Sequence, residues 1–116
     1  MVFEMNLNNE PFSLIKSGEK TVELRLYDEK RRQIAVGDYI RFTAQNGDVL
    51  VCMIKRLHVY PSFKELYKCI PLEKCGYTKE NIAFASHKDM EKYYPLEKQK
   101  LYSVVGIEIE LINSAN

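Results

Sequence analysis

Apolar and polar residues alternate along several short stretches of the chain, the pattern expected of strands with one buried face. In the second stretch, for example, Val22, Leu24 and Leu26 alternate with polar side chains. The stretches that fit this pattern are residues 2–7, 21–27, 39–44, 49–60 and 104–111. The fourth stretch is apolar on both faces at its start, which predicts a central strand that is bent or bulged just before Lys55.

The spacing of apolar residues changes to the helical period in two regions. In the first, Asn8 or Asn9 is expected to cap a short helix that ends at Gly18. The second region lies before the last strand and opens with Ser62 and Glu65, the pattern of a capping box. Further helical turns are expected over residues 71–76, from Thr78 toward His87, over 89–93 and over 96–101.

The dipeptide Asn46-Gly47 between the third and fourth strands predicts a tight type I′ hairpin. With about five to six strands and a cluster of helices before the last one, the chain is expected to be α+β. The strands would form a small, mostly antiparallel barrel or an open sheet, and the final strand would help to remove an exposed edge. Residues 1–116 contain neither repeats nor a long linker, so a single domain is expected.

The charge balance narrows the range of functions. The formal net charge is +1 at pH 7, whereas proteins that hold nucleic acid mainly through phosphates usually carry a strong basic excess. A nucleic-acid role would therefore depend on a local patch or on recognition of a base or nucleoside. No apolar run reaches the length of a membrane span and no signal-peptide pattern opens the chain, so we expect a cytoplasmic protein without membrane attachment.

Cysteine and histidine usage does not indicate a metal site. The three cysteines, Cys52, Cys69 and Cys75, are an odd number, and the last two have the wrong spacing for a zinc knuckle. We therefore expect reduced thiols, mostly buried, and neither a bound metal nor a cofactor.

The main candidate site lies where the first helix meets the second strand. Residues 18–25 read Gly-Glu-Lys-Thr-Val-Glu-Leu-Arg, which places Lys20, Glu23 and Arg25 within six residues. The strand period puts Glu23 and Arg25 on one face, together with Thr21. Such a group is either a solvated ion pair on a sheet surface or a polar pocket, in which arginine offers a planar donor fork and glutamate accepts from an amine.

Residues 18–25 match the pattern Gly-x-Lys-x-x-Glu-x-Arg, which resembles the signature of the ASCH domain, a family similar to the PUA domains of RNA-modifying proteins. The helix before the motif, a late Tyr93-Tyr94 pair and a closing strand fit the same family. The resemblance covers residues 2–112 and implies a PUA-like β-barrel with helical insertions.

The resemblance also implies a cleft between the barrel and its helical insertion. The ligand of this cleft would be RNA or a nucleotide-like small molecule. The protein itself would be a monomer or a weak homodimer. The two cations would hold phosphate or carbonyl oxygens, Glu23 would accept from an exocyclic amine, and a tyrosine would stack on a base. The residues expected to bind the ligand are Lys20, Thr21, Glu23, Arg25, Tyr93 and Tyr94.

Lys30, Arg31 and Arg32 form the most basic cluster of the chain. A run of this kind is usually a solvated loop. Because the cluster directly follows the motif strand, it is also the first place where a phosphate backbone would be expected to bind.

The family suggests an enzymatic alternative, a small hydrolase. Some ASCH relatives are amidohydrolases that remove an acyl group from acetylated cytidine, and others are assigned ribonuclease activity. In the amidohydrolases the third residue after the lysine is a threonine nucleophile, whereas this chain has Glu23. A carboxylate is a poor nucleophile at an amide, so in an enzyme Lys20 and Glu23 would be catalytic in another way, with Glu23 as general base on a water. A third hypothesis is that the chain is a structural or adaptor protein, in which the motif only stabilises the fold.

Overall fold

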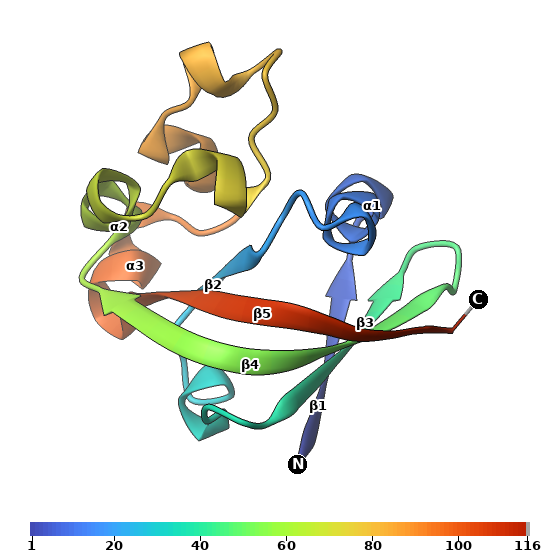
Figure 1. The fold of residues 1–116 in the computed structure, drawn as a ribbon. Coiled ribbons are helices and arrows are strands. Elements are labelled where there is room, and N and C mark those ends of the chain that lie inside the picture. Colours follow the sequence, from blue (N-terminus) through green and yellow to red (C-terminus); the bar gives the residue numbers. More distant parts are fainter. Residues whose placement is uncertain (116) are drawn as a thin grey trace.

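The computed structural model describes residues 1–115, which form a five-stranded sheet, three α-helices and four short 3-10 helices (Figure 1). The strands are β1 (Val2–Leu7), β2 (Val22–Leu26), β3 (Tyr39–Ala44), β4 (Val49–Tyr60) and β5 (Val104–Ala115). The α-helices are α1 (Asn9–Ser17), α2 (Phe63–Cys69) and α3 (Leu96–Tyr102), and the 3-10 helices are η1 (Arg31–Gln33), η2 (Leu72–Cys75), η3 (Ile82–Phe84) and η4 (His87–Met90). In this part of the chain no helix has both the length and the apolar character needed to cross a membrane.

The sheet has the strand order β1-β3-β4-β5-β2 and curls into a half-barrel (Figure 1). The pairing of β1 with β3 is parallel, and the other neighbouring strands pair antiparallel. The predicted α+β class with mostly antiparallel strands is therefore confirmed. The last strand, β5, lies between β4 and β2, so β1 and β2 are the edges of the hydrogen-bonded sheet.

Two hydrophobic clusters hold the sheet to its helices. The first joins α1 to β1, β3, β4 and β5 through residues such as Phe12, Ile15 and Phe42. The second joins the helical insertion to β2, for example through Phe63 and Leu66. The motif strand is thus fixed between sheet and insertion.

Gly106 on β5 allows the insertion to approach the sheet closely. A Cβ atom at this position would lie 2.9 Å from Ile70 Cδ1 and 3.2 Å from Val22 Cγ1. Both distances are shorter than an ordinary van der Waals contact, so a larger residue would push the end of α2 away from β2.

The hairpin between β3 and β4 differs from the predicted type I′ turn. A type I′ turn needs positive φ at both central residues, but Asn46 does not have it and Gly47 has φ 94°. Gly47 N donates to Ala44 O at 3.0 Å, and Ala44 N donates to Asp48 O at 2.9 Å. These bonds define a three-residue loop, a type I turn followed by a left-handed glycine.

The insertion contains less α-helix than predicted. In place of the helix expected from Thr78 toward His87, the chain forms only the short turns η3 and η4. The side chain of Phe84 is 83% exposed and Ile82 is 37% exposed, so a helix here would bury no apolar face to stabilise it. The predicted capping box at Ser62 is also wrong, because the Ser62 hydroxyl donates to the Glu65 carboxylate instead of accepting from the backbone.

The predicted irregularity in β4 is confirmed by a register shift between Ile54 and Arg56. The shift reverses which face the later side chains occupy, so Leu57 packs on the core. His58 instead lies 3.1 Å from Glu108 on β5, from its Nε2 to Oε1.

Candidate functional site

Glu23 is the buried centre of the motif, with 4% of the residue exposed. Lys20 Nζ lies 2.8 Å from Glu23 Oε1, and Arg25 Nε lies 2.7 Å from Glu23 Oε2. Each carboxylate oxygen therefore contacts one cation. The solvated ion pair that the strand pattern allowed is wrong, because the face of β2 that carries Glu23 is covered by the walls of a cleft.

Lys20 reaches Glu23 because of two glycines. Gly18 ends α1 with φ 85°, which turns the chain so that Lys20 N donates to Leu14 O at 3.0 Å. The side chain then passes Gly76, which has φ 106° and where a Cβ atom would lie 3.2 Å from Lys20 Cδ. This close passage fixes the direction of the Lys20 side chain, which the strand period alone could not determine.

Arg25 makes a second contact besides Glu23. Its Nη2 donates to the backbone oxygen of Asn6 on β1 at 2.8 Å. These two bonds use Nε and Nη2 and leave Nη1 as a donor for a ligand.

Glu23 and Arg25 stabilise each other in their ionised forms. Burial raises the pKa of Glu23, but attraction and hydrogen bonds from Lys20 and Arg25 outweigh this effect, so the pKa lies below its ordinary value of 4.5. Burial lowers the pKa of Arg25, and the neighbouring Glu23 carboxylate more than restores it, so this pKa is raised. Two cations against one carboxylate leave an excess of one positive charge, which favours an anionic or carbonyl group.

The motif lies in a cleft of about 980 Å³ between the sheet edge, α1 and the insertion. Aromatic side chains from the insertion line it. Tyr93 is 57% exposed, and its neighbour Tyr94 stacks on Phe63 with a centroid distance of 5.9 Å. The cleft thus combines charged donors with a partly exposed aromatic wall.

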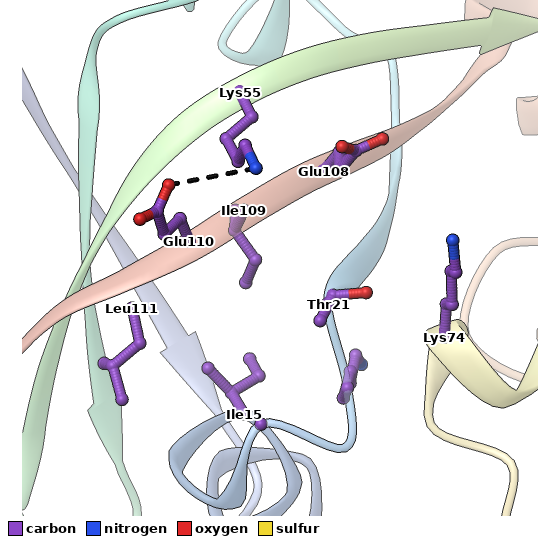
Figure 2. A pocket seen from close by; sticks show the side chains of 10 residues that line it. Ile15, Thr21, Lys55, Lys74, Glu108, Ile109, Glu110 and Leu111 are labelled. Atoms are coloured by element: carbon purple, nitrogen blue, oxygen red, sulfur yellow. Dashed lines mark ion pairs between the residues drawn. The ribbon is translucent and has the colours of Figure 1, made fainter.

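The structure brings together most of the predicted site residues. Those that line this cleft are Lys20, Glu23, Arg25, Tyr93 and Tyr94. Thr21 instead lines a smaller pocket of about 400 Å³, shown in Figure 2 with Lys74 and Glu108. The strand pattern placed Thr21 beside Glu23, but β2 begins only at Val22, and Thr21 does not share the cleft.

The basic cluster lines neither of these two pockets. Arg31 Nη1 lies 3.2 Å from Asp28 Oδ2, and the Arg32 guanidinium lies 4.5 Å from the centre of the Tyr27 ring. Lys30 is exposed. Two members of the cluster are therefore engaged within the protein, and a phosphate-binding role for Lys30, Arg31 and Arg32 stays a prediction.

Sequence reasoning missed several residues that shape the cleft. Gln99 on α3 is 2% exposed; its Oε1 accepts from Phe63 N at 3.0 Å and its Nε2 donates to Tyr94 O at 2.8 Å. No sequence signal marks Gln99, because glutamine on a helix is usually exposed.

In the described part of the chain, no three His, Cys, Asp or Glu side chains gather as a metal site.

A family model for the ASCH domain matches residues 5–113. The chain belongs to the ASCH domain family. The prediction from the Gly18–Arg25 motif is therefore confirmed at the level of the family, and Lys20, Glu23 and Arg25 of this ASCH domain lie together in one cleft.

Solved structures agree with the family and the fold. The chain is 42% identical to the hypothetical protein PH0355, with a TM-score of 0.81, over 97% of this chain and 100% of that one. It is 39% identical to protein PF0455 from Pyrococcus furiosus, with a TM-score of 0.75, over 97% and 99% of the two chains. The S128A mutant of ZmASCH from Zymomonas mobilis shares the fold at a TM-score of 0.66, with 15% identity over 99% of this chain and 73% of that one. The predicted PUA-like fold is thus confirmed. No curated protein matches the chain.

Proposed function

We propose that this ASCH domain binds RNA or a nucleotide-like small molecule in the cleft of the motif. The observation that carries the proposal is the buried Glu23, which holds Lys20 and Arg25 beside an open cleft with an aromatic wall. Apolar side chains often stabilise a core as well as a buried ion group does. Buried ionisable groups with shifted pKa values in a cleft are instead typical of functional sites.

The proposed roles follow from the donors that remain. Lys20 Nζ has three N–H groups and Arg25 keeps Nη1, so both can donate to a phosphate or carbonyl oxygen. Tyr93 offers a partly exposed ring on which a base would stack. The cleft volume of about 980 Å³ suits a ligand of nucleotide size. Glu23 orients the two cations, since both of its oxygens already contact them.

Hydrolysis is less well supported than binding. The lowered pKa of Glu23 makes its carboxylate a weak general base. Thr21, a hydroxyl nucleophile by residue type, lines the smaller pocket, to which Lys20 also contributes, and not the cleft that holds Glu23 and Arg25. The geometry therefore favours recognition over cleavage of a modified nucleoside or of RNA.

The experiment is calorimetric titration of a short single-stranded RNA and of cytidine monophosphate into the wild-type protein, Lys20→Met and Tyr93→Ala. Lys20→Met keeps the stem beside Gly76 but removes the charge, and Tyr93→Ala removes an exposed ring. Lys98→Met, an exposed cation on α3 outside the cleft, is the matched control.

We expect binding that both cleft variants weaken about tenfold or more and the control leaves unchanged. Absence of binding to the wild type, or equal weakening by Lys98→Met, would reject the proposal. The same samples are incubated with acetylated cytidine and the RNA and are analysed by mass spectrometry. Turnover that is lost in Lys20→Met would replace the binding role with the hydrolase alternative.

A further inference from the structure

Three side chains of the insertion form a hydrogen-bond relay in the wall of the cleft. The hydroxyl oxygens of Tyr67 and Tyr77 are 2.7 Å apart, and the Tyr77 hydroxyl donates to Asp89 Oδ2 at 2.8 Å. Asp89 Oδ2 also accepts from Ser86 N at 3.1 Å. We call Tyr67, Tyr77 and Asp89 the wall relay.

The protons of the wall relay all point toward Asp89. Tyr77 has one hydroxyl proton, which it gives to Asp89, so Tyr67 must donate to Tyr77. Burial raises the pKa of Tyr67 to about 12 and also raises that of Tyr77, so both hydroxyls keep their protons at neutral pH. At its two ends the relay therefore offers only acceptors, which are the Tyr67 oxygen and the Asp89 carboxylate.

The wall relay and the motif belong to the same cleft. All three relay residues line it together with Lys20 and Arg25. Tyr77 directly follows Gly76, against which the Lys20 side chain lies. Tyr67 is on α2 and Asp89 is on η4, and this part of the insertion stands above the sheet in Figure 1. A ligand in the cleft would thus meet donors from β2 and acceptors from the insertion.

This arrangement matters because Glu23 is already engaged. The sequence suggested Glu23 as the acceptor for an amine, but each of its oxygens already contacts a cation and only 4% of the residue is exposed. The wall relay supplies acceptors that are more open to the cleft than Glu23, because Asp89 is exposed and Tyr67 is partly exposed. A keto oxygen placed there would face other acceptors without a proton between them, which is unfavourable.

We propose that the wall relay recognises the exocyclic amino group of a nucleobase, so that the cleft prefers bases that carry an amino group over those that carry a keto oxygen at the same position. The inference rests on the proposed nucleotide-binding function and adds the chemistry by which the base is selected.

The test uses two pairs of nucleotides that differ in this group. Cytidine and uridine monophosphate form one pair, and adenosine and inosine monophosphate form the other. Each is titrated into the wild-type protein, Tyr67→Phe and Asp89→Asn. Tyr39→Phe, a tyrosine on β3 that does not line the cleft, is the matched control. Tyr67→Phe keeps the ring contact with Tyr77, whose ring centroid is 5.9 Å away.

We expect the wild type to bind the amino member of a pair about tenfold more tightly than the keto member. Both relay variants should bring this ratio close to one, mainly by weakening the amino ligand, and Tyr39→Phe should not change it. A relay that only supports the fold would instead weaken all four nucleotides equally, which would overturn the inference. Equal affinity of the wild type for both members of each pair would also overturn it and leave nucleotide binding standing. If no nucleotide or RNA binds, the proposed function fails and this inference fails with it.

Discussion

Arg25 on β2 donates a hydrogen bond from Nη2 to the backbone oxygen of Asn6 on β1, at 2.8 Å. These two strands are the edges of the half-barrel and do not pair with each other. The side chain of Arg25 therefore joins the two edges of the curled sheet at the place where the cleft lies. The Arg25 guanidinium thus makes a structural contact through Nη2 and keeps Nη1 as a donor for a ligand.

Arg25→Met should destabilise the protein, because it removes this link and leaves Glu23 with Lys20 as its remaining cation. We expect the free energy of unfolding, measured with urea, to fall by about 2–4 kcal/mol. Arg41→Met is the matched control, since Arg41 pairs with Glu4 at 2.6 Å but is 49% exposed. The control variant should lose less than about 1 kcal/mol of unfolding free energy. Equal losses in the two variants would show that burial of the motif adds nothing.

Stability should depend on the protonation of Glu23 in acid. The pKa of Glu23 in the folded protein is lowered below 4.5, so its contribution is present above that pH and is lost as the pH falls through the folded value. Glu23→Gln should be less stable than the wild type at pH 7, and the difference should shrink at about pH 3. Urea unfolding of both proteins at pH 7 and at about pH 3 measures this difference in stability. A difference that stays constant between the two values would contradict the lowered pKa.

Gly76→Ala should affect both stability and ligand binding. An alanine would adopt φ 106° with strain, and its Cβ would press on Lys20 at 3.2 Å. We expect a loss of about 1–2 kcal/mol in unfolding free energy together with weaker RNA binding in calorimetry. Gly47→Ala has a similar φ of 94° but open space around the Cβ, so it should lose stability and keep its affinity. The prediction fails if the two variants bind RNA equally well.

Gln99→Leu should leave two buried backbone groups without partners, the N–H of Phe63 and the carbonyl of Tyr94. Each such group carries a desolvation penalty, and we expect a total cost of about 1–3 kcal/mol in thermal or urea unfolding. Gln33→Leu, at an exposed position of η1, is the control and should be nearly neutral. A stable Gln99→Leu protein would mean that the bonds of Gln99 do not matter for holding Tyr94.

Most of the fold could be predicted because its signals are local. Strand alternation located all five strands, and Gly18 marked the end of α1. The prediction of a type I′ turn was wrong because Asn46 keeps a φ that is not positive. Its side-chain oxygen accepts a hydrogen bond from Asp48 N at 3.0 Å. The helix expected after Thr78 failed because a periodic sequence does not reveal that Phe84 remains exposed.

The sequence singled out Lys20, Glu23, Arg25 and the Tyr93-Tyr94 pair, which line the cleft, but not the rest of its wall. Alternation placed Glu23 and Arg25 on one face but could not show that this face is covered. That cover comes from residues far away in the chain, such as Gly76 and Tyr77, which approach β2 only in the folded protein. The binding roles of the motif residues remain predictions for the experiments above.

The central claim is that the motif cleft binds the ligand, and backbone amide chemical-shift mapping by NMR with a short single-stranded RNA tests it most directly. We predict shifts concentrated at residues 20, 23–25, 76–77 and 93–94, which line the cleft. Shifts confined to Lys30, Arg31 and Arg32, or no shifts at saturating RNA, would contradict the account.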